Sequence, residues 1–279
     1  MRCIASKCAV VVLLLLSSLA AWSENERPDP QITIHAGLVP WRPAATPAAK
    51  YGNLQNLTQE DNGLVGWGSC VPCAGGSSDN ATLSSSPFQT SPSVDGSSRD
   101  FYINGEAYSD GLWWYKVGPN DAATNFQEDF WLNVAANTES AQALEFDTYQ
   151  FKGGREYMFG TQCDYASHTW DVWNSEALKW NHTDIPCKKF SPNTWYHLTF
   201  NFHRTSPDDY EHYDNLTIVE YNRAGKILAR NVYSFNKAFP AQWTPRGWSD
   251  DLGVQFQMDI GGAGGQMREW VDEVSLTAW

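Results

Sequence analysis

The chain is poor in basic residues, and this shortage excludes whole classes of partner. Of its 279 residues, 19 are Lys or Arg against 32 Asp or Glu, so the formal net charge is −13. A surface this acidic repels phosphate backbones, and nucleic acid is therefore not an expected partner. Anionic membranes and acidic polysaccharides are disfavoured for the same reason, unless calcium bridges the charges.

No hydrophobic run is long enough to cross a bilayer, which takes about 20 residues. The longest lies at residues 9–16, with Arg2 and Lys7 before it and the small residues Ser17, Ser18, Ala20 and Ala21 after it. This layout is typical of a secretory signal peptide. We therefore expect residues 1–23 to be a signal peptide and the protein to be secreted or periplasmic, without membrane insertion. An N-terminal membrane anchor is the alternative.

Cysteine is also scarce: the chain has six, and two of them fall within the expected signal peptide. An even number of cysteines in an oxidising compartment predicts disulfides. The favoured pairs, close in sequence, are Cys70–Cys73 and Cys163–Cys187. A redox motif at 70–73 is one alternative, but such motifs precede a helix in an α/β pattern. A zinc site from all four is another, and its spacing matches no common ligand pattern.

Helical periodicity is nearly absent, and strand-like alternation takes its place. Apolar residues recur at every second position over residues 130–134, 144–146, 196–202 and 252–260. Such alternation is typical of strands with one face in a core. Further strands are expected over 111–116, 156–162, 169–173, 216–221, 226–235 and 270–277. This many strands in one chain predict an all-β, two-sheet antiparallel jelly-roll sandwich.

The remaining segments define the expected domain layout. Residues 24–50 are proline-rich with little periodicity and are expected to form an N-terminal arm. Residues 51–279 contain no linker-like break and are expected to form one β-sandwich domain. Within that domain, residues 74–98 are rich in Ser and Gly and are expected to form a long surface loop.

The second face of the predicted strands carries amides, short acids, histidines and tryptophans, with almost no lysine. Amides and carboxylates hydrogen-bond to neighbouring hydroxyls, and aromatic rings stack on the apolar faces of sugars. The pattern favours a carbohydrate groove; a face wetted by solvent or covered by the 74–98 loop is the alternative. Trp113 and Trp114 are neighbours on a strand, so one is expected in the core and the other free to bind. At least one of Trp170, Trp173 and Trp180 is expected to be a sugar platform.

Three segments resemble the concanavalin A-like superfamily, in particular laminin G-like domains. Residues 195–199, Trp-Tyr-His-Leu-Thr, resemble that group's Trp-His-His-Val strand, and a glycine-containing hairpin follows at 216–230. Residues 270–276 resemble its closing strand of the type Ile-Asp-Glu-Val-x-Ile. The resemblance covers residues 100–279 and implies a jelly roll whose concave sheet often faces a glycan.

A fourth segment, Glu-Phe-Asp-Thr-Tyr-Gln at 145–150, resembles the catalytic strand of laminarinase-type glycoside hydrolases, Glu-x-Asp-x-x-Glu. The resemblance implies a nucleophile at Glu145 and an assisting role for Asp147. The acid/base place holds Gln150, which cannot transfer a proton. An enzyme is therefore less favoured than a binding protein, and Glu145 and Asp147 are its candidate catalytic residues. Residues 150–157 also resemble an alginate lyase strand, without that family's companion motifs.

Together these patterns predict a secreted, lectin-like domain that binds a polysaccharide or other glycan. A polysaccharide-degrading enzyme of the same superfamily and a structural extracellular domain are the alternatives. The predicted ligand-binding residues are Glu145, Asp147, Gln150, Trp173, His197, Asn201, Gln255 and Gln257. Most of these lie opposite the apolar series of their strands and so should border one groove. Gln150 is an odd number of residues from Glu145, so it would point to the apolar side of a regular strand. It can border the groove only if the strand has a bulge between Asp147 and Gln150.

No cofactor is required by this prediction, and a structural calcium ion is an option. Its hard oxygen ligands would come from Asp208, Asp209, Glu211, Asp250 and Asp251. These positions match no ordered calcium-loop pattern, so a solvated acidic surface is the preferred explanation.

Overall fold

The structure is a computed structural model that describes residues 33–34, 48–58, 66–71, 80–206, 208–243 and 249–279. Residues 32–279 form one compact unit. The expected signal peptide, residues 1–23, lies outside the described residues. Within the described part of the chain, no helix has both the length and the apolar character needed to cross a membrane.

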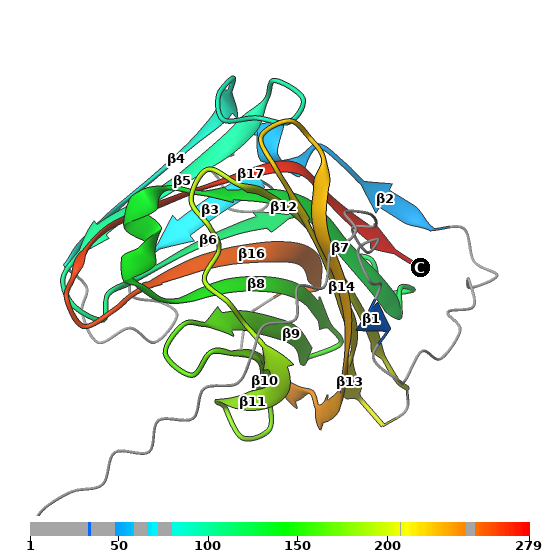
Figure 1. Cartoon of the computed structure of the whole chain (residues 1–279). Helices are drawn as coiled ribbons and strands as arrows, with labels where there is room; N and C mark the ends of the chain where they lie inside the picture. The colour runs from blue at the N-terminus through cyan, green and yellow to red at the C-terminus, as the bar shows by residue number, and fades with distance from the viewer. Residues whose placement is uncertain (1–32, 35–47, 59–65, 72–79, 207, 244–248) are drawn as a thin grey trace, which may run out of the picture. The chain divides into compact units, whose positions relative to one another are not determined.

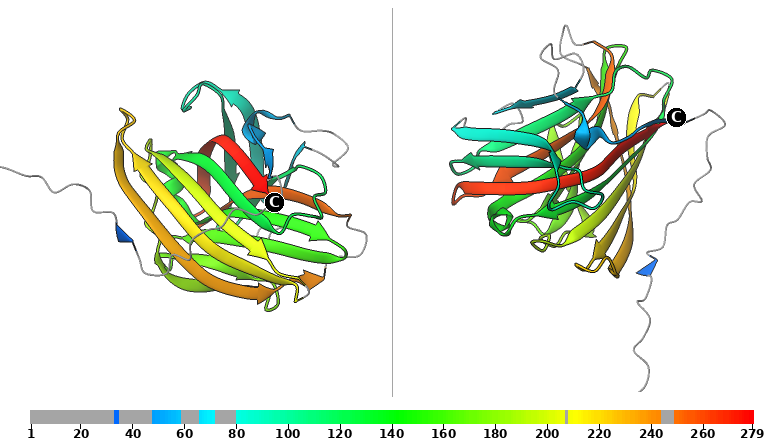
Figure 2. Two further views of the ribbon diagram at one scale, coloured as in Figure 1. Left: turned by 90° about the vertical axis from the view of Figure 1, so that its right-hand side faces the viewer. Right: turned by 90° about the horizontal axis from the view of Figure 1, so that it is seen from above.

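The unit is built of β-strands in two sheets, as the alternation predicted (Figure 1). The nine-stranded sheet has the order β1-β14-β13-β12-β7-β17-β5-β4, and β2 pairs with β17. Its strands are β1 (Thr33–Ile34), β2 (Ala49–Tyr51), β4 (Ala81–Gln89), β5 (Ser98–Gly105), β7 (Asn125–Val134), β12 (Trp195–Arg204), β13 (Tyr210–Tyr221), β14 (Ile227–Pro240) and β17 (Gly265–Ala278). Figure 2 shows β14, β13, β12 and β7 side by side, in orange to green.

The eight-stranded sheet has the order β11-β10-β9-β8-β16-β6-β3, and β15 pairs with β9. Its strands are β3 (Gly66–Cys70), β6 (Asp110–Lys116), β8 (Ala141–Lys152), β9 (Arg155–Asp164), β10 (Thr169–Asn174), β11 (Lys179–Pro186), β15 (Gln242–Trp243) and β16 (Asp251–Ile260). Apart from the parallel pair β1–β14, the strand pairs are antiparallel. Two short 3-10 helices, η1 (Leu54–Asn56) and η2 (Ala136–Ser140), are the helical segments described. The predicted all-β, two-sheet jelly-roll sandwich is confirmed.

The core forms where the apolar series of the two sheets meet. Phe130 of β7 lies between Phe146 of β8 and Phe256 of β16, with ring centroids 5.2 and 5.1 Å away. All three rings are fully buried. Burying a side chain of this size contributes roughly 1.5–3 kcal/mol, so these contacts hold the sheets together. Because the apolar side of each strand faces this core, the polar series of each sheet must face outward.

The prediction of a loop over residues 74–98 is wrong for its central part. Residues 81–89 form β4, an edge strand that pairs with β5. The burial of β4 alternates along its length, and Leu83 packs against the core. The sequence of β4 shows no alternation of apolar and polar residues, because small polar side chains occupy most of its positions. An edge strand can be built this way because few of its side chains must pack in the core. Residues 72–79 lie outside the described part of the chain.

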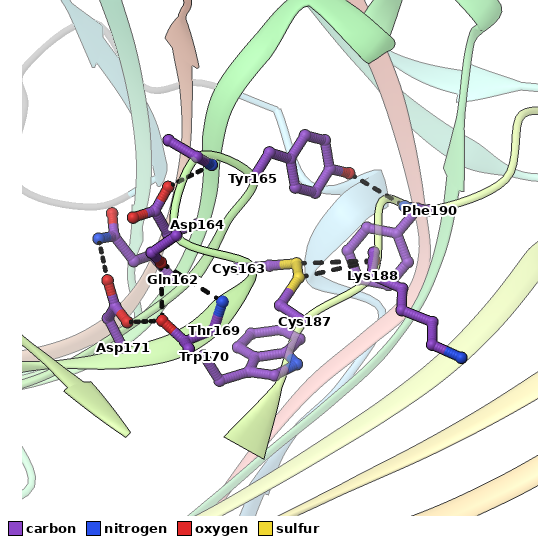
Figure 3. Close-up of a disulfide and its surroundings, with 12 residues drawn as sticks. Gln162, Cys163, Asp164, Tyr165, Thr169, Trp170, Asp171, Cys187, Lys188 and Phe190 are labelled. Carbon is purple, nitrogen blue, oxygen red and sulfur yellow. Dashed lines mark hydrogen bonds between the residues drawn. A yellow bond between two sulfur atoms is a disulfide. The ribbon is translucent and has the colours of Figure 1, made fainter. Parts of the chain in front are cut away.

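The disulfide between Cys163 and Cys187 is present, as predicted (Figure 3). It joins the end of β9 to the segment that follows β11. Tyr165 accompanies it, and its hydroxyl accepts a hydrogen bond of 3.1 Å from the backbone N–H of Phe190. Cys70 is also disulfide-bonded. Its predicted partner, Cys73, lies outside the described residues.

Candidate functional site

A cavity of about 760 Å³, called the groove below, lies on the outer face of the eight-stranded sheet. Its aromatic lining is Trp114 from β6, Tyr149 and Phe151 from β8, Trp173 from β10 and Trp180 from β11. Its polar lining includes Glu145, Asp147, Glu156, Gln242, Gln255 and Gln257. A cavity of this size, apolar with a few polar groups, is the usual form of a small-ligand site.

Strand register arranges the central lining residues in one row across the sheet. Trp114 is paired with Gln255, Gln255 with Asp147, and Asp147 with Gly160. On the far side, Trp173 is paired with Trp180. The row therefore has an indole at one end, a pair of indoles at the other, and an amide and a carboxylate between them.

Gly160 keeps this row open. A Cβ atom at this position would lie 2.9 Å from the Cβ of Trp173 and 3.3 Å from the ring of Trp180. The same atom would lie 3.5 Å from Oδ1 of Asp147, which shows how closely the carboxylate approaches the tryptophan pair. The two indoles meet edge to face, 5.4 Å apart at an interplanar angle of 69°. Such a contact orients both rings.

The next row of the sheet is a hydrogen-bonded series of acids and amides. Gln257 Nε2 donates to Oε1 of Glu145 at 2.8 Å and to Oδ1 of Asp259 at 2.9 Å. On the neighbouring strands, Gln162 Nε2 donates to Oδ2 of Asp171 at 3.0 Å. Glu145 and Asp259 also hydrogen-bond to each other, so the amide of Gln257 donates to two carboxyl groups that are already in contact.

Burial shifts the ionisation of these acids. Burial and the charges of Asp259 and Asp147 hold the pKa of Glu145 well above its ordinary value. Burial raises the pKa of Asp147 to about 8, although a hydrogen bond from the backbone N–H of Thr161 acts in the opposite direction. Burial also raises the pKa of Asp259 to about 6. At neutral pH, Asp147 therefore holds a proton in the free protein.

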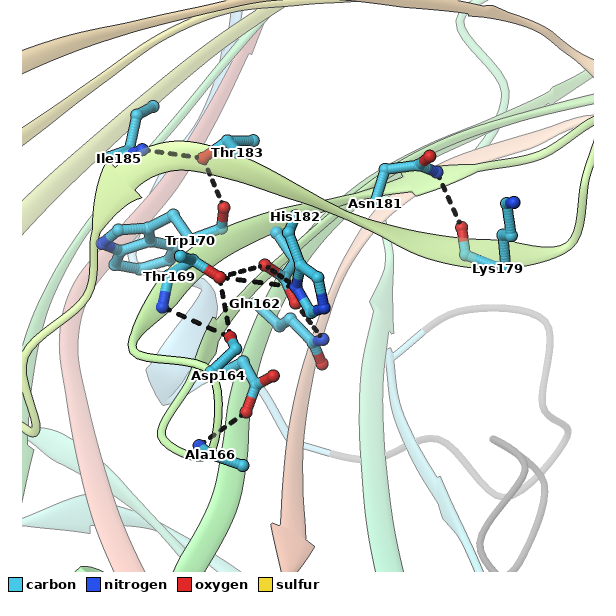
Figure 4. Close-up of polar contacts among 12 residues, drawn as sticks. Gln162, Asp164, Ala166, Thr169, Trp170, Lys179, Asn181, His182, Thr183 and Ile185 are labelled. Atoms are coloured by element: carbon cyan, nitrogen blue, oxygen red, sulfur yellow. Dashed lines mark hydrogen bonds and ion pairs between the residues drawn. The ribbon is translucent and has the colours of Figure 1, made fainter.

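At the β9–β11 side of this sheet, three side chains form a group that could hold a metal ion: Asp164, Asp171 and His182. Figure 4 labels Asp164 and His182, and Figure 3 labels Asp171. Carboxylate and imidazole are both common metal ligands. In the structure, however, His182 Nδ1 lies 2.9 Å from Oδ1 of Asp171, and Thr169 Oγ1 donates to the same oxygen at 2.7 Å. Asp171 is thus fully engaged in a hydrogen-bonded network, which also raises the pKa of His182.

Five of the eight predicted ligand-binding residues line the groove: Glu145, Asp147, Trp173, Gln255 and Gln257. The alternation of side chains along each strand correctly placed the polar residues of β8 and β16 on one face, because neighbouring strands of a sheet share their pleat. Their role in binding stays a prediction.

Gln150 does not border the groove, and the predicted bulge is wrong. β8 pairs with β9 without a register shift, and its pairing with β16 is irregular only at Asp259/Ile260. In a regular strand Gln150 must point to the core side. It is fully buried there, and its Nε2 donates to the carbonyl oxygens of Asn120 at 2.7 Å and Ala123 at 3.3 Å. The likeness of residues 145–150 to a laminarinase strand therefore does not extend to its geometry.

His197 and Asn201 also lie away from the groove, on the outer face of the nine-stranded sheet. His197 Nε2 is 2.9 Å from Oδ1 of Asp129, and Asn201 Nδ2 donates to Oδ1 of Asn215 at 2.8 Å. Parity showed that both point away from the core. It could not show which of the two outer faces they occupy, because that depends on the sheet that β12 joins.

Several groove residues were not among the eight. Trp114 lines the groove while Trp113 is 1% exposed in the core, as their adjacency predicted. Likewise Trp170 is buried and Trp180 lines the groove. Glu156, Met158 and Gln242 were missed because β9 and β15 show no clean alternation. Asp259, which accepts a hydrogen bond from the groove residue Gln257, has the same parity in the alternation of residues 252–260.

Of the acids considered for calcium, Asp209, Glu211 and Asp251 have protein partners. Oδ2 of Asp209 lies 3.2 Å from Arg155 Nε, and Oδ2 of Asp251 lies 3.5 Å from Lys116 Nζ. Glu211 is fully buried and accepts hydrogen bonds from Ser175. Calcium binding stays an untested prediction.

No family model and no curated protein matches the sequence. Solved structures that match include peanut lectin with a 9mer peptide, at TM-score 0.44 and 9% identity, covering 84% of this chain and 99% of that one. Arcelin-5, a lectin-like defense protein from Phaseolus vulgaris, matches at 0.43 and 10%, covering 83% and 98%. The PL-14 alginate lyase from Aplysia kurodai matches at 0.46 and 8%, covering 71% and 87%.

Proposed function

We propose that the protein binds a glycan in the groove. The observation that carries this proposal is the central row, in which indoles flank an amide and a carboxylate. Gln255 Nε2 contacts the sulfur of Met158 at 3.7 Å, and no described residue donates to its Oε1. Asp147 accepts one hydrogen bond, at Oδ1 from the backbone N–H of Thr161 at 3.0 Å, and none from a described residue at Oδ2.

These unpartnered oxygens suit sugar hydroxyl groups, which can both donate and accept a hydrogen bond. Asp147 is 6% exposed and Gln255 is 9% exposed, so each side chain is largely removed from water. An unsatisfied polar atom in such a place costs free energy, which a ligand hydroxyl would offset. The half-buried rings of Trp114, Trp173 and Trp180 supply the surfaces on which the apolar face of a sugar stacks.

Polysaccharide cleavage is the second candidate function, favoured by the raised pKa of Asp147 and Glu145, since a catalytic acid must hold a proton at working pH. The geometry favours binding instead. Glu145 and Asp147 are two residues apart on one regular strand, so both reach a ligand from the same side. Glycosidases need two carboxyl groups that flank the scissile bond. A structural extracellular domain, the third alternative, leaves the groove without a role.

The test is retention of the full chain on a panel of neutral and charged polysaccharide gels, with Trp173→Ala as the probe variant. We expect Trp173→Ala to weaken retention about tenfold or more, which corresponds to roughly 1.4 kcal/mol. Trp131→Ala is the matched control, because Trp131 stacks on His197 at 4.8 Å on the other outer face. Equal retention of Trp173→Ala and the unmodified protein would contradict the proposal. Release of reducing or unsaturated sugar, lost in Glu145→Gln, would establish the enzyme instead.

A further inference from the structure

The lining of the groove is strongly acidic. Three carboxylates, Glu145, Asp147 and Glu156, belong to it. Lys116 is the one basic residue among the described side chains that line it, and its Nζ already lies 3.5 Å from Oδ2 of Asp251. The groove therefore brings together acidic side chains without a free cation among the described residues that line it.

Asp147 shows this imbalance most directly. It is 6% exposed, it lines the groove, and no described residue donates to its Oδ2. A buried carboxylate normally has a cationic or hydrogen-bonding partner at each oxygen, because burying an unpaired charge is costly. Even the half-buried Asp129 on the other outer face has both oxygens engaged, since His197 and Thr199 contact them at 2.9 and 2.6 Å.

We propose that the groove selects oligosaccharides of amino sugars whose amine is free and positively charged, and that Asp147 receives the ammonium group. This inference rests on the proposed glycan binding and deepens it. An ammonium group has three donors and a compact charge, so it can supply Oδ2 of Asp147 with the partner that the protein does not.

The nearby tryptophan pair favours a sugar as the molecule that bears the ammonium group. Gly160 separates Asp147 from Trp173, and a Cβ atom there would lie 3.5 Å from Oδ1 of Asp147 and 2.9 Å from the Cβ of Trp173. A pyranose stacked on the indole would therefore hold a ring substituent beside the carboxylate. The negative face of an indole also attracts cations, which adds to the preference for an aminated ring.

Proton movement gives the inference a second observable. The titratable groups whose charges act on Asp147, or are acted on by it, are Glu145, Asp259, Glu128 and Tyr213. None of these is a cation, and burial raises the pKa of Asp147 to about 8. At pH 6 the free protein holds a proton on Asp147, which an arriving ammonium group would displace. A neutral sugar would displace none.

The test uses three tetrasaccharides that differ only in the substituent at C2: oligomers of glucose, N-acetylglucosamine and glucosamine. Binding to the full chain is measured by calorimetry at pH 6 in two buffers of different ionisation enthalpy. We expect the glucosamine oligomer to bind about tenfold tighter than the glucose oligomer or more, with release of a proton to the buffer. In Asp147→Asn the glucosamine-to-glucose affinity ratio should fall to about two or less, without proton release. Asp129→Asn is the control and should keep the ratio of the unmodified protein.

The outcomes separate this inference from the proposed function. Glucosamine binding that is no tighter than glucose binding would overturn the selectivity and leave glycan binding intact. A glucosamine preference that persists in Asp147→Asn would overturn the assigned contact. If neither these oligomers nor the polysaccharide panel binds, the proposed function fails and this inference fails with it.

Discussion

The two outer faces of the sandwich carry the same kinds of side chain and use them differently. On β7, β12 and β13 of the nine-stranded sheet, several polar side chains satisfy one another: Asp129 accepts from His197 and Thr199, and His203 Nδ1 lies 2.9 Å from Asp214. On the eight-stranded sheet, Asp147 and Gln255 lie in a cavity with acceptor atoms to which no described residue donates. The difference teaches that two polar side chains can both point away from the core and still differ in whether the protein already supplies their hydrogen-bond partners.

The largest effect is expected from the tryptophan on the core side of β6. Trp113 is 1% exposed and packs on Phe101 at 5.0 Å, so Trp113→Ala should cost about 3–5 kcal/mol of unfolding free energy. Trp114→Ala, on the groove side, should cost about 1 kcal/mol or less and weaken glycan retention instead. Urea unfolding of both variants measures the contrast. Equal destabilisation by the two would show that Trp114 is a core residue.

Removing the disulfide should have the next largest effect, and it acts on the groove-bearing sheet. Cys163 and Cys187 close a loop with a sequence separation of 24, so replacing both by Ala should cost about 3 kcal/mol. Because the bond ties β9 to the end of the β10–β11 hairpin that carries Trp173 and Trp180, glycan retention should also fall. The measurement is thermal unfolding together with gel retention. Unchanged retention in a folded variant would show that the hairpin is held in place without the bond.

Neutralising Asp147 should stabilise the protein at alkaline pH. Its pKa is raised to about 8 in the folded protein, whereas an Asp in the unfolded chain has a pKa of about 4. Between these two pH values the folded protein keeps the proton of Asp147 and the unfolded chain has lost it. The contribution of Asp147 to the free energy of unfolding is therefore fully present at low pH and is lost as the pH rises through 8. Asp147→Asn should be more stable than the unmodified protein by roughly 1–3 kcal/mol at pH 9, and the difference should shrink at pH 5. Urea midpoints at both values test this, and a destabilised variant at pH 9 would refute it.

The same change on the other outer face should have the opposite sign and the smallest size. Burial would raise the pKa of Asp129, but hydrogen bonds from His197 and Thr199 outweigh burial and lower it. Asp129 therefore contributes stability above about pH 4 that is lost as pH falls. Asp129→Asn should cost about 0.5–1 kcal/mol at pH 7 and nearly nothing at pH 3. If Asp129→Asn instead stabilised the protein at pH 7 in the same unfolding assay, the proposed difference between the two outer faces would be contradicted.

The candidate site was only partly predictable from the sequence, and its individual residues show why. Glu145, Asp147, Gln255 and Gln257 were placed correctly because β8 and β16 are neighbours in one sheet. His197 and Asn201 were misplaced because their strand, β12, pairs with β7 and β13 in the other sheet. Gln150 was misplaced because the laminarinase-like motif implied a bulge that the regular pleat of β8 does not contain.

By itself, the sequence determined that the chain forms strands and which side of most of them is apolar. Side-chain direction in a strand alternates with a period of two set by its own backbone, so it is a local property. Only the tertiary structure decided which strands became neighbours, and pairing between distant segments has no local signature. That pairing placed Trp114, Asp147 and Gly160 in one row with Trp173 beside Gly160, and so made a groove out of residues that the sequence keeps far apart.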